Sequence, residues 1–388
     1  MKFVLYTTSV SAHQLPLARE IIRRVGADNF RFVHTGESQG GAQDVVVHEP
    51  WIVHVTVASE ILESAEFLLC DVRDIDLIER RVFKGLRTYY TSERWFKPIP
   101  LISTAAKDVP WLRGLKGLYL PGWVRMLVPN YRRRALRFRR LLQDNSLKGV
   151  FEYLPVSMNS AHDMEQLLRL SPWINVRRGE YAVGDQVAER MHLWGYFVAP
   201  SCKSKDELEQ LRQRQVAEVR DGVRPLRILW VGRMMALKNI DVILRAFKVA
   251  VQSGLNGELT LVGKGTERMR MEQLAEKLGL QDIVKFSPPV SLDGVRELMR
   301  AHDLYVFASN GFDGWGAVVS EALEEHMTVI ASQDCGAGAS ALPCECTFPC
   351  RNVRALARLM TSFDSLPRRD ARNWSAYAAA NWLLERVP

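Results

Sequence analysis

Residues 227–254 read RILWVGRMMALKNIDVILRAFKVAVQSG, and this stretch decides the fold class. Arg227–Val231 is a short apolar run, which predicts a buried strand. A glycine follows the run, and Ile240–Ser253 then shows apolar residues at helical spacing. A strand, a glycine loop and a helix in this order are typical of a doubly wound parallel sheet.

The same alternation continues on both sides of this stretch. Toward the C-terminus it predicts strands at Glu258–Val262, Val284–Phe286, Leu304–Phe307 and Val329–Ala331, and helices at Glu267–Leu278, Leu292–Ala301 and Ala317–Glu325. In the N-terminal half it predicts strands at Lys2–Thr7, Phe30–His34, Phe67–Cys70, Arg87–Tyr90 and Val150–Leu154, and helices at Leu15–Val25 and Asp74–Lys84. We therefore expect an α/β protein with two Rossmann-like domains that face an inter-domain cleft, where open α/β sheets bind ligands.

Chain length and composition set the expected domain limits. A chain of 388 residues is too long for one ordinary core. We expect an N-terminal Rossmann-like domain over 1–200, a polar linker with a solvated helix over 201–222 and a second Rossmann-like domain over 223–365. Residues 366–388 are expected to be a helical segment that could pack back on the N-terminal domain.

The net charge of +8 is concentrated in one stretch. Trp111–Gln143 holds nine basic residues and no acidic ones, interleaved with aromatic and aliphatic side chains. This composition suits contact with anionic lipid headgroups, although an ordinary solvated basic helix has the same composition. No recognised nucleic-acid module surrounds the stretch, so we expect a membrane surface rather than nucleic acid as its partner.

The lack of a secretory signal and the few cysteines both favour a cytoplasmic location. The first residues lack the apolar stretch of a secretory signal, and no apolar run approaches the roughly 18–20 residues of a membrane span. The six cysteines are sparse, and the cluster Cys344-x-Cys346-x3-Cys350 matches no usual zinc signature. We expect a cytoplasmic protein, peripheral on the inner face of the cytoplasmic membrane, with no metal and no cofactor.

Two cations follow the strand quoted first. Gly232 lets its loop approach a ligand closely, and Arg233 and Lys238 project from that loop five residues apart. A guanidinium fork and a separate point charge suit the two negative groups of a diphosphate.

A second motif, SNGFDGWGAVVSEAL over 309–323, runs from a strand end through a glycine-rich turn into a helix. Free amide groups at the start of that helix make a site for phosphate. Asp313 lies in the turn, and Glu321 lies on the helix where it could reach a ribose. A third motif, Leu261-Val262-Gly263-Lys264-Gly265, is a strand that ends in a Gly-x-Gly turn.

The three motifs, in this order, resemble the retaining glycosyltransferases of the GT-B fold, specifically family 4. The resemblance is strong from Arg227 to Ala331, whereas the first half is similar in layout only. It implies that Arg233 and Lys238 neutralise the donor diphosphate, that Glu321 holds the ribose hydroxyls and that Asp313 contacts the donor sugar. The further donor-binding residues that it implies are Gly232, Gly263, Gly265, Gly314, Trp315 and Gly316. The family has glutamate where this chain has Asp313, a difference of one methylene.

The acceptor side has weaker signals. His13 lies in the loop after the first strand, His162 is followed by Asp163, and Glu93 and Arg94 end another strand. A histidine beside an acid could orient an acceptor hydroxyl, so His162 is a candidate catalytic residue and His13, Glu93 and Arg94 are candidate acceptor contacts. Asp74-Ile75-Asp76 looks like the Asp-x-Asp metal motif of another glycosyltransferase fold, but we interpret it as a helix cap.

The leading hypothesis is a retaining, metal-independent transferase. It would move a hexose from a UDP- or GDP-linked sugar to a surface-glycan or lipid-linked acceptor. The alternatives are a sugar-nucleotide epimerase of the same fold, or a degenerate transferase that serves as a membrane-associated assembly partner.

Overall fold

The computed structural model describes residues 2–11, 13–36, 49–97, 99–100, 119–170, 189–368 and 374–386. The chain divides into two compact units. The first unit comprises Met1–Ser11 and Ile21–Trp194, and the second comprises Ala12–Glu20 and Gly195–Pro388. Each unit has its own parallel sheet, as the alternation of strands and helices predicts.

The first unit is built on a sheet with the order β3-β2-β1-β4-β5-β8. Its strands are β1 (Phe3–Thr7), β2 (Phe30–His34), β3 (Ile52–His54), β4 (Phe67–Cys70), β5 (Arg87–Ser92) and β8 (Phe151–Pro155). All neighbouring pairs are parallel, with Phe3 beside Phe30 and Phe67. Every residue of β1, β4 and β8 is buried, because a parallel sheet carries helices on both faces.

Four helices of the described chain lie within the first unit: α3 (Ser59–Ser64), α4 (Ile75–Phe83), α5 (Pro129–Gln143) and α6 (Met158–Arg169). Helix α1 (Leu15–Val25) is divided between the units, since residues 15–20 belong to the second and residues 21–25 to the first. A small antiparallel pair, β6 (Ile99–Pro100) and β7 (Tyr119–Leu120), lies apart from the main sheet. The Asp74 carboxylate accepts a hydrogen bond from the Leu77 amide at 3.0 Å, so Asp74 caps α4 as interpreted.

The second unit has a sheet with the order β11-β10-β9-β12-β13-β14. Its strands are β9 (Leu226–Val231), β10 (Gly257–Val262), β11 (Val284–Ser287), β12 (Leu304–Phe307), β13 (Thr328–Ser332) and β14 (Thr347–Phe348). Counted within each unit, both sheets have the strand order 3-2-1-4-5-6 of the Rossmann fold. In such a sheet the ligand-binding loops follow the carboxyl ends of the strands, here β9, β10 and β12.

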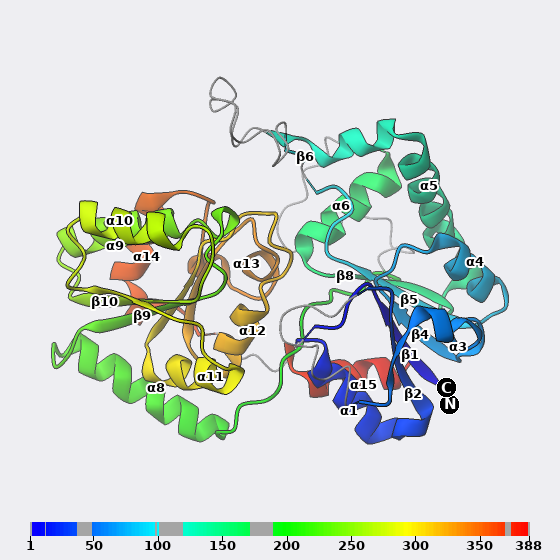
Figure 1. Cartoon of the computed structure of the whole chain (residues 1–388), viewed down its shortest axis with the longest axis horizontal. Coiled ribbons are helices and arrows are strands. Elements are labelled where there is room, and N and C mark those ends of the chain that lie inside the picture. Colours follow the sequence, from blue (N-terminus) through cyan, green and yellow to red (C-terminus); the bar gives the residue numbers. More distant parts are fainter. Residues whose placement is uncertain are drawn as a thin grey trace. The chain divides into compact units, whose positions relative to one another are not determined.

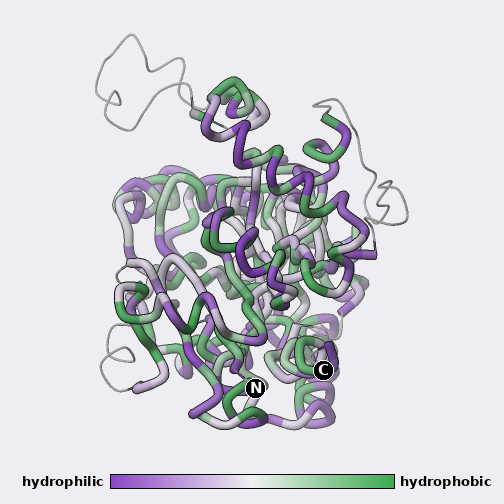
Figure 2. The backbone as a smooth tube through the Cα atoms, turned by 90° about the vertical axis from the view of Figure 1, so that its right-hand side faces the viewer, coloured by the Kyte–Doolittle hydropathy of each residue, from purple (hydrophilic) through white to green (hydrophobic). Residues whose placement is uncertain are grey.

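The helices of the second unit cover both faces of its sheet. They are α8 (Lys205–Arg220), α9 (Ile240–Gln252), α10 (Arg268–Lys277), α11 (Leu292–Ala301), α12 (Ala317–Glu324), α13 (Gly336–Ser340), α14 (Val353–Thr361) and α15 (Ala376–Leu384). Figure 1 shows α9, α10 and α14 on one side of β9 and β10, and α8 and α11 on the other. Hydrophilic and hydrophobic residues alternate along the outer helices, as a helix packed on one face requires (Figure 2).

The structure differs from the expected linker at 201–222. Most of this segment is α8, which begins with a capping box formed by Ser204 and Glu207. Leu208 and Arg212 are buried, and the Arg212 guanidinium donates to the carbonyls of Met299, His302 and Glu325. The segment is therefore a packed helix of the second unit. Its polar sequence hides this role because two of its three buried residues, Arg212 and Gln215, are polar.

The unit boundary also differs from the expected one. Residues 12–20, expected in the N-terminal domain, belong with the C-terminal unit, and so does the segment expected at 366–388. The His13 ring stacks on Tyr196 with 4.3 Å between centroids, and the backbones of Val198 and Ser375 form a β-bridge. Residues 111–118 of the basic stretch lie outside the described part of the chain.

Candidate active site

The loop after β9 and the loop after β10 are held together by their backbones. The Gly232 amide donates to the Val262 carbonyl at 3.0 Å, and the Met234 amide donates to the Lys264 carbonyl at 2.9 Å. Gly263 has φ of +144°, and a Cβ there would lie 1.9 Å from the Gly232 carbonyl oxygen. The predicted Gly-x-Gly turn thus permits two loops to touch, and this contact fixes the backbone that carries Arg233 and Lys238.

Lys238 and Asp313 form an ion pair across two loops. The Lys238 ammonium donates to the Asp313 carboxylate, and both side chains are mostly buried. The Asn310 amide donates to the Leu237 carbonyl at 3.0 Å, so a backbone bond also joins the loop after β9 to the loop after β12. Two residues 75 positions apart, predicted to share a site, are therefore in direct contact.

The start of α12 lies beside the same pair. The Lys238 ammonium lies 5.0 Å from the centre of the Phe307 ring, and a Cβ on Gly316 would lie 2.6 Å from that ring. Gly316 has φ of +89° and precedes α12, whose first turn has no side-chain cap. The lysine and the helix start therefore meet over one aromatic ring. Both can attract an anion, because uncapped amides at a helix start bind anions.

Arg233 is exposed, and within the described part of the chain no carboxylate pairs with it. A guanidinium left without a protein partner beside this loop is available for a ligand. Its loop is fixed, because the Met235 amide donates to the Arg233 carbonyl and the Glu267 amide donates to the Met234 carbonyl.

Trp315 does not face a ligand. Its side chain is fully buried, the indole N–H donates to the Ser320 hydroxyl at 2.9 Å, and its ring packs against Trp374. The indole is therefore part of the core, and the donor contact expected at Trp315 is left to its backbone amide. Its backbone is held by the Ala337 amide, which donates to the Trp315 carbonyl, and the Gly336 amide likewise donates to the Gly314 carbonyl.

Glu321 lies on α12, the helix on which the sequence places it. Burial raises the pKa of its carboxyl group, while the nearby Arg296 guanidinium opposes this effect. The carboxylate has no hydrogen-bond partner among the described residues, whereas Arg296 donates to the Glu321 carbonyl and to Glu325. A carboxylate without a protein donor can accept hydrogen bonds from ligand hydroxyls.

His162 and its neighbour Asp163 have different hydrogen-bond partners. Asp163 accepts two bonds from the Arg94 guanidinium and one from the Phe96 amide, while His162 contacts Gln166 at 3.1 Å. Both residues lie on α6, where successive side chains point in different directions. Burial lowers the pKa of the His162 imidazole, so the neutral form of the ring is favoured.

Of the other acceptor-side candidates, Arg94 is held by Asp163 and Glu93 pairs with Lys97 at 2.9 Å. His13 stacks on Tyr196 and belongs to the second unit. The structure thus gives Arg94 a clear role in fixing the loop after β5, a role that leaves less of its guanidinium for a ligand.

Asp71 is a candidate that sequence reasoning missed. It follows β4 at the carboxyl edge of the first sheet and accepts a hydrogen bond from the Thr8 amide at 3.0 Å. Burial raises the pKa of its carboxyl group to about 7, the Thr8 hydrogen bond opposes this, and the Glu93 carboxylate adds to it. Shifted carboxyl groups of this kind cluster at functional sites. The signal in the sequence was an acid directly after a predicted strand.

The described residues hold no group of three or more His, Cys, Asp or Glu side chains arranged to bind a metal ion. Among the same residues, no helix is long and apolar enough to span a bilayer.

Comparison with known proteins agrees with this geometry. The family model for glycosyl transferases group 1 matches residues 212–381, the part of the chain that holds Lys238, Asp313 and α12. The C-terminal half of the chain is thus similar to the glycosyl transferases group 1 family. The match begins within α8, which agrees with the packing of that helix on the second unit.

The curated relatives match only part of the chain. D-inositol 3-phosphate glycosyltransferase of Thermomonospora curvata is 32% identical over 114 residues, which are 27% of this chain and 26% of the relative. Alpha-D-kanosaminyltransferase of Streptomyces kanamyceticus is 26% identical over 146 residues, 37% of this chain and 36% of the relative. The matched part thus spans between a quarter and just over a third of the length of these relatives.

Solved structures match over the whole chain. Alr3699/HepE of Anabaena, in complex with UDP, has a TM-score of 0.59 at 14% identity and covers 100% of this chain and 96% of its own. The lipopolysaccharide outer core galactosyltransferase WaaB has a TM-score of 0.61 at 10% identity, with 100% and 99% covered. These similarities show the fold: two Rossmann-like domains of the GT-B type, as the sequence predicts.

Proposed function

We propose that this protein is a retaining glycosyltransferase that moves a hexose from a nucleotide-diphosphate sugar to a surface-glycan or lipid-linked acceptor. The observation that carries the proposal is the convergence of Lys238, Asp313 and the uncapped start of α12 over Phe307. Two of these groups attract a diphosphate, and the third is placed to contact the sugar attached to it.

The roles follow from the chemistry of the groups. The bond between the sugar C1 and the diphosphate oxygen breaks, and negative charge accumulates on the leaving group. Lys238, Arg233 and the amides at the start of α12 meet that charge, which is the usual way that a site lowers such a barrier. The acceptor oxygen then bonds to C1 on the face that the diphosphate left, and the acceptor proton passes to the departing phosphate.

Two further residues fit the donor. Glu321, whose carboxylate has no donor among the described residues, would accept hydrogen bonds from the ribose hydroxyls. Asp313 would contact the donor sugar once the diphosphate draws Lys238 away from it. Uridine is the base we favour, because the Anabaena neighbour is named in complexes with UDP and with UDP-glucose.

The test is nucleotide release that depends on an acceptor. We expect the purified chain to release UDP from UDP-glucose or a related UDP-hexose only when a glycan or lipid-linked acceptor is present, with or without EDTA. Release of nucleotide without any acceptor would favour the epimerase. Persistent nucleotide binding with no transfer to any acceptor would favour the degenerate transferase.

We also propose peripheral contact with the inner face of an anionic cytoplasmic membrane. The side chains of Leu127 and Val128 are 80% and 55% exposed and directly precede α5, which carries exposed Arg132 and Arg133. Apolar side chains beside unpaired cations suit a lipid headgroup region.

Vesicle binding tests this contact. We expect anionic vesicles to bind the chain, less strongly as salt rises, and about ten-fold or more less tightly when Arg132 and Arg133 are both changed to Gln. Arg220→Gln, an exposed change in the other unit, is the matched control. Binding that ignores salt and both arginines would contradict the proposal.

A further inference from the structure

A second pocket lies in the first unit, away from the residues assigned to the donor. Its lining residues come from the segment after β4, from β5 and the loop that follows it, and from α4 and α5; they include Arg73, Tyr90, Trp95, Tyr131, Arg134 and Phe138. Its volume is about 50 Å³. One water molecule needs roughly 10–15 Å³ of such space, so the pocket admits a group of a few heavy atoms and no sugar ring.

Two buried donors point to a missing ligand. Among the described residues, neither the Tyr90 O–H nor the Trp95 indole N–H has a hydrogen-bond acceptor, although the two residues are only 1% and 4% exposed. Buried polar groups are almost always paired, since an unpaired donor loses its bonds to water and gains none. The Arg73 guanidinium, which donates to the Arg94 carbonyl, also lies close enough to interact with the Tyr90 hydroxyl oxygen. Because a guanidinium can only donate, this contact leaves the Tyr90 O–H proton without an acceptor.

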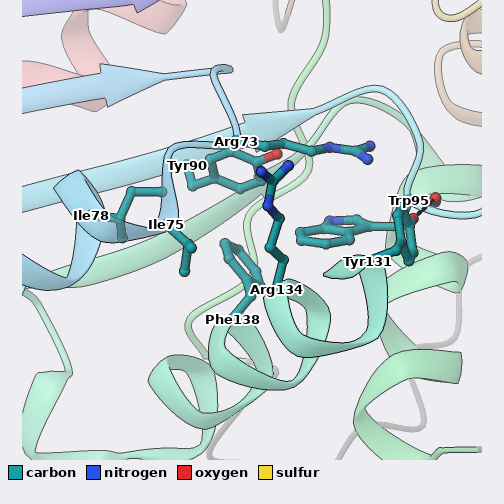
Figure 3. Close-up of a pocket in the computed structure, with 8 residues that line it drawn as sticks. All are labelled: Arg73, Ile75, Ile78, Tyr90, Trp95, Tyr131, Arg134 and Phe138. Carbon is teal, nitrogen blue, oxygen red and sulfur yellow. Dashed lines mark hydrogen bonds between the residues drawn. The ribbon is translucent and has the colours of Figure 1, made fainter. Parts of the chain in front are cut away.

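The positive charge of the pocket favours a negatively charged ligand. Arg73 and Arg134 line it, and no carboxylate does. Figure 3 shows Arg73 entering from above and Arg134 rising from α5, with the Arg134 guanidinium directed toward the Tyr90 hydroxyl. Arg73 also lies over the Trp95 ring, 4.9 Å from its centre. Nearby Arg137, by contrast, is neutralised by Asp76 and Glu79.

We propose that this pocket, which we call the oxyanion pocket, binds a phosphoryl group. A phosphate monoester offers three acceptor oxygens and close to two negative charges at neutral pH. Arg134 and Arg73 supply the charge, and the Tyr90 hydroxyl and Trp95 N–H supply two neutral donors. Tyr131 holds the arrangement in place, because its hydroxyl donates to the Trp95 carbonyl.

The size and position of the pocket limit its role. The pocket has room for the phosphoryl group only, so the rest of the molecule that bears this group would lie outside the pocket. A soluble sugar phosphate and a phospholipid headgroup present the same chemistry there. The proposal concerns the first unit and is independent of whether the second unit transfers sugar.

The experiment measures phosphate binding by the full chain with two variants and a matched control. We expect inorganic phosphate and a hexose monophosphate to bind the wild type, about ten-fold or more less tightly with Arg134→Met and several-fold less tightly with Tyr90→Phe. Arg140→Met, an exposed arginine of the same helix that does not line the pocket, should bind as the wild type does. Equal affinity in all four proteins, or no binding to any, would overturn the proposal.

Two further readouts keep the test independent of folding and of the donor site. Tyr90→Phe removes an unpaired hydroxyl, so without phosphate its melting temperature should equal or exceed that of the wild type, and phosphate should raise it less. UDP binding should be the same in every variant. Phosphatidate vesicles that bind in an Arg134-dependent way, while hexose monophosphate does not, would assign the phosphoryl group to a lipid; the reverse result would assign it to a soluble ligand.

Discussion

At the scale of single residues, Asp313 reaches Lys238 in spite of its short side chain. The shorter side chain is drawn toward the ammonium by the pair itself, and the backbone bond from Asn310 to Leu237 holds the two loops at contact distance. The residue types of this pair were predictable because each follows a strand end in a local motif. The contact between them was not, since it depends on how two loops 75 positions apart fold together.

Asp71 makes the stability of the folded chain depend on pH. Its pKa is about 7 in the folded chain and near 3.8 when it is unperturbed, so the folded state holds this proton more tightly. The stability that this group contributes is therefore full below about pH 4 and is lost as pH rises through 7, at up to about 1.4 kcal/mol per pH unit.

Asp71→Asn removes that dependence. We expect the variant to become progressively more stable than the wild type between about pH 4 and pH 7, as measured by chemical denaturation of both proteins across that range. Asp282→Asn, an exposed change, serves as the control. A difference between Asp71→Asn and the wild type that stays constant with pH would contradict the assignment.

At the scale of elements, α8 shows why a polar sequence can still be structural. Most of its residues face water, but Arg212 reaches into the core and donates to three backbone carbonyls that end α11 and α12. Burial lowers the pKa of this guanidinium to about 10. Strands and amphipathic helices were predictable from apolar spacing. The docking of α8 was not, because polar Arg212 and Gln215 occupy two of the buried positions on its packed face.

Replacing Arg212 with Leu tests this docking. The change leaves carbonyls without their donor in a buried place, so we expect the free energy of unfolding of the second unit to fall by about 2–4 kcal/mol. Arg214→Leu, on the exposed face of the same helix, should change it by no more than about 0.5 kcal/mol. Equal effects of the two substitutions would show that α8 is held in another way.

At the scale of the whole molecule, two sheets of the same strand order carry different chemistry on their carboxyl edges. The second unit gathers cations and a helix start, and it is the part that matches the glycosyl transferases group 1 family. The first unit gathers Asp71, Glu93 and the oxyanion pocket, none of which forms a contiguous motif. Its fold was predictable from alternation, while its side-chain clusters were not, because Arg73, Tyr90 and Arg134 are distant in sequence.

The central claim is that Arg233, Lys238 and the start of α12 bind one diphosphate. Calorimetric titration of UDP into the wild type, Arg233→Ala, Lys238→Ala and the exposed control Lys285→Ala tests it directly. We expect the first two variants each to weaken UDP binding by about ten-fold or more, with uridine binding and the Lys285→Ala affinity unchanged. Wild-type affinity for UDP in both the Arg233 and the Lys238 variant would contradict the account.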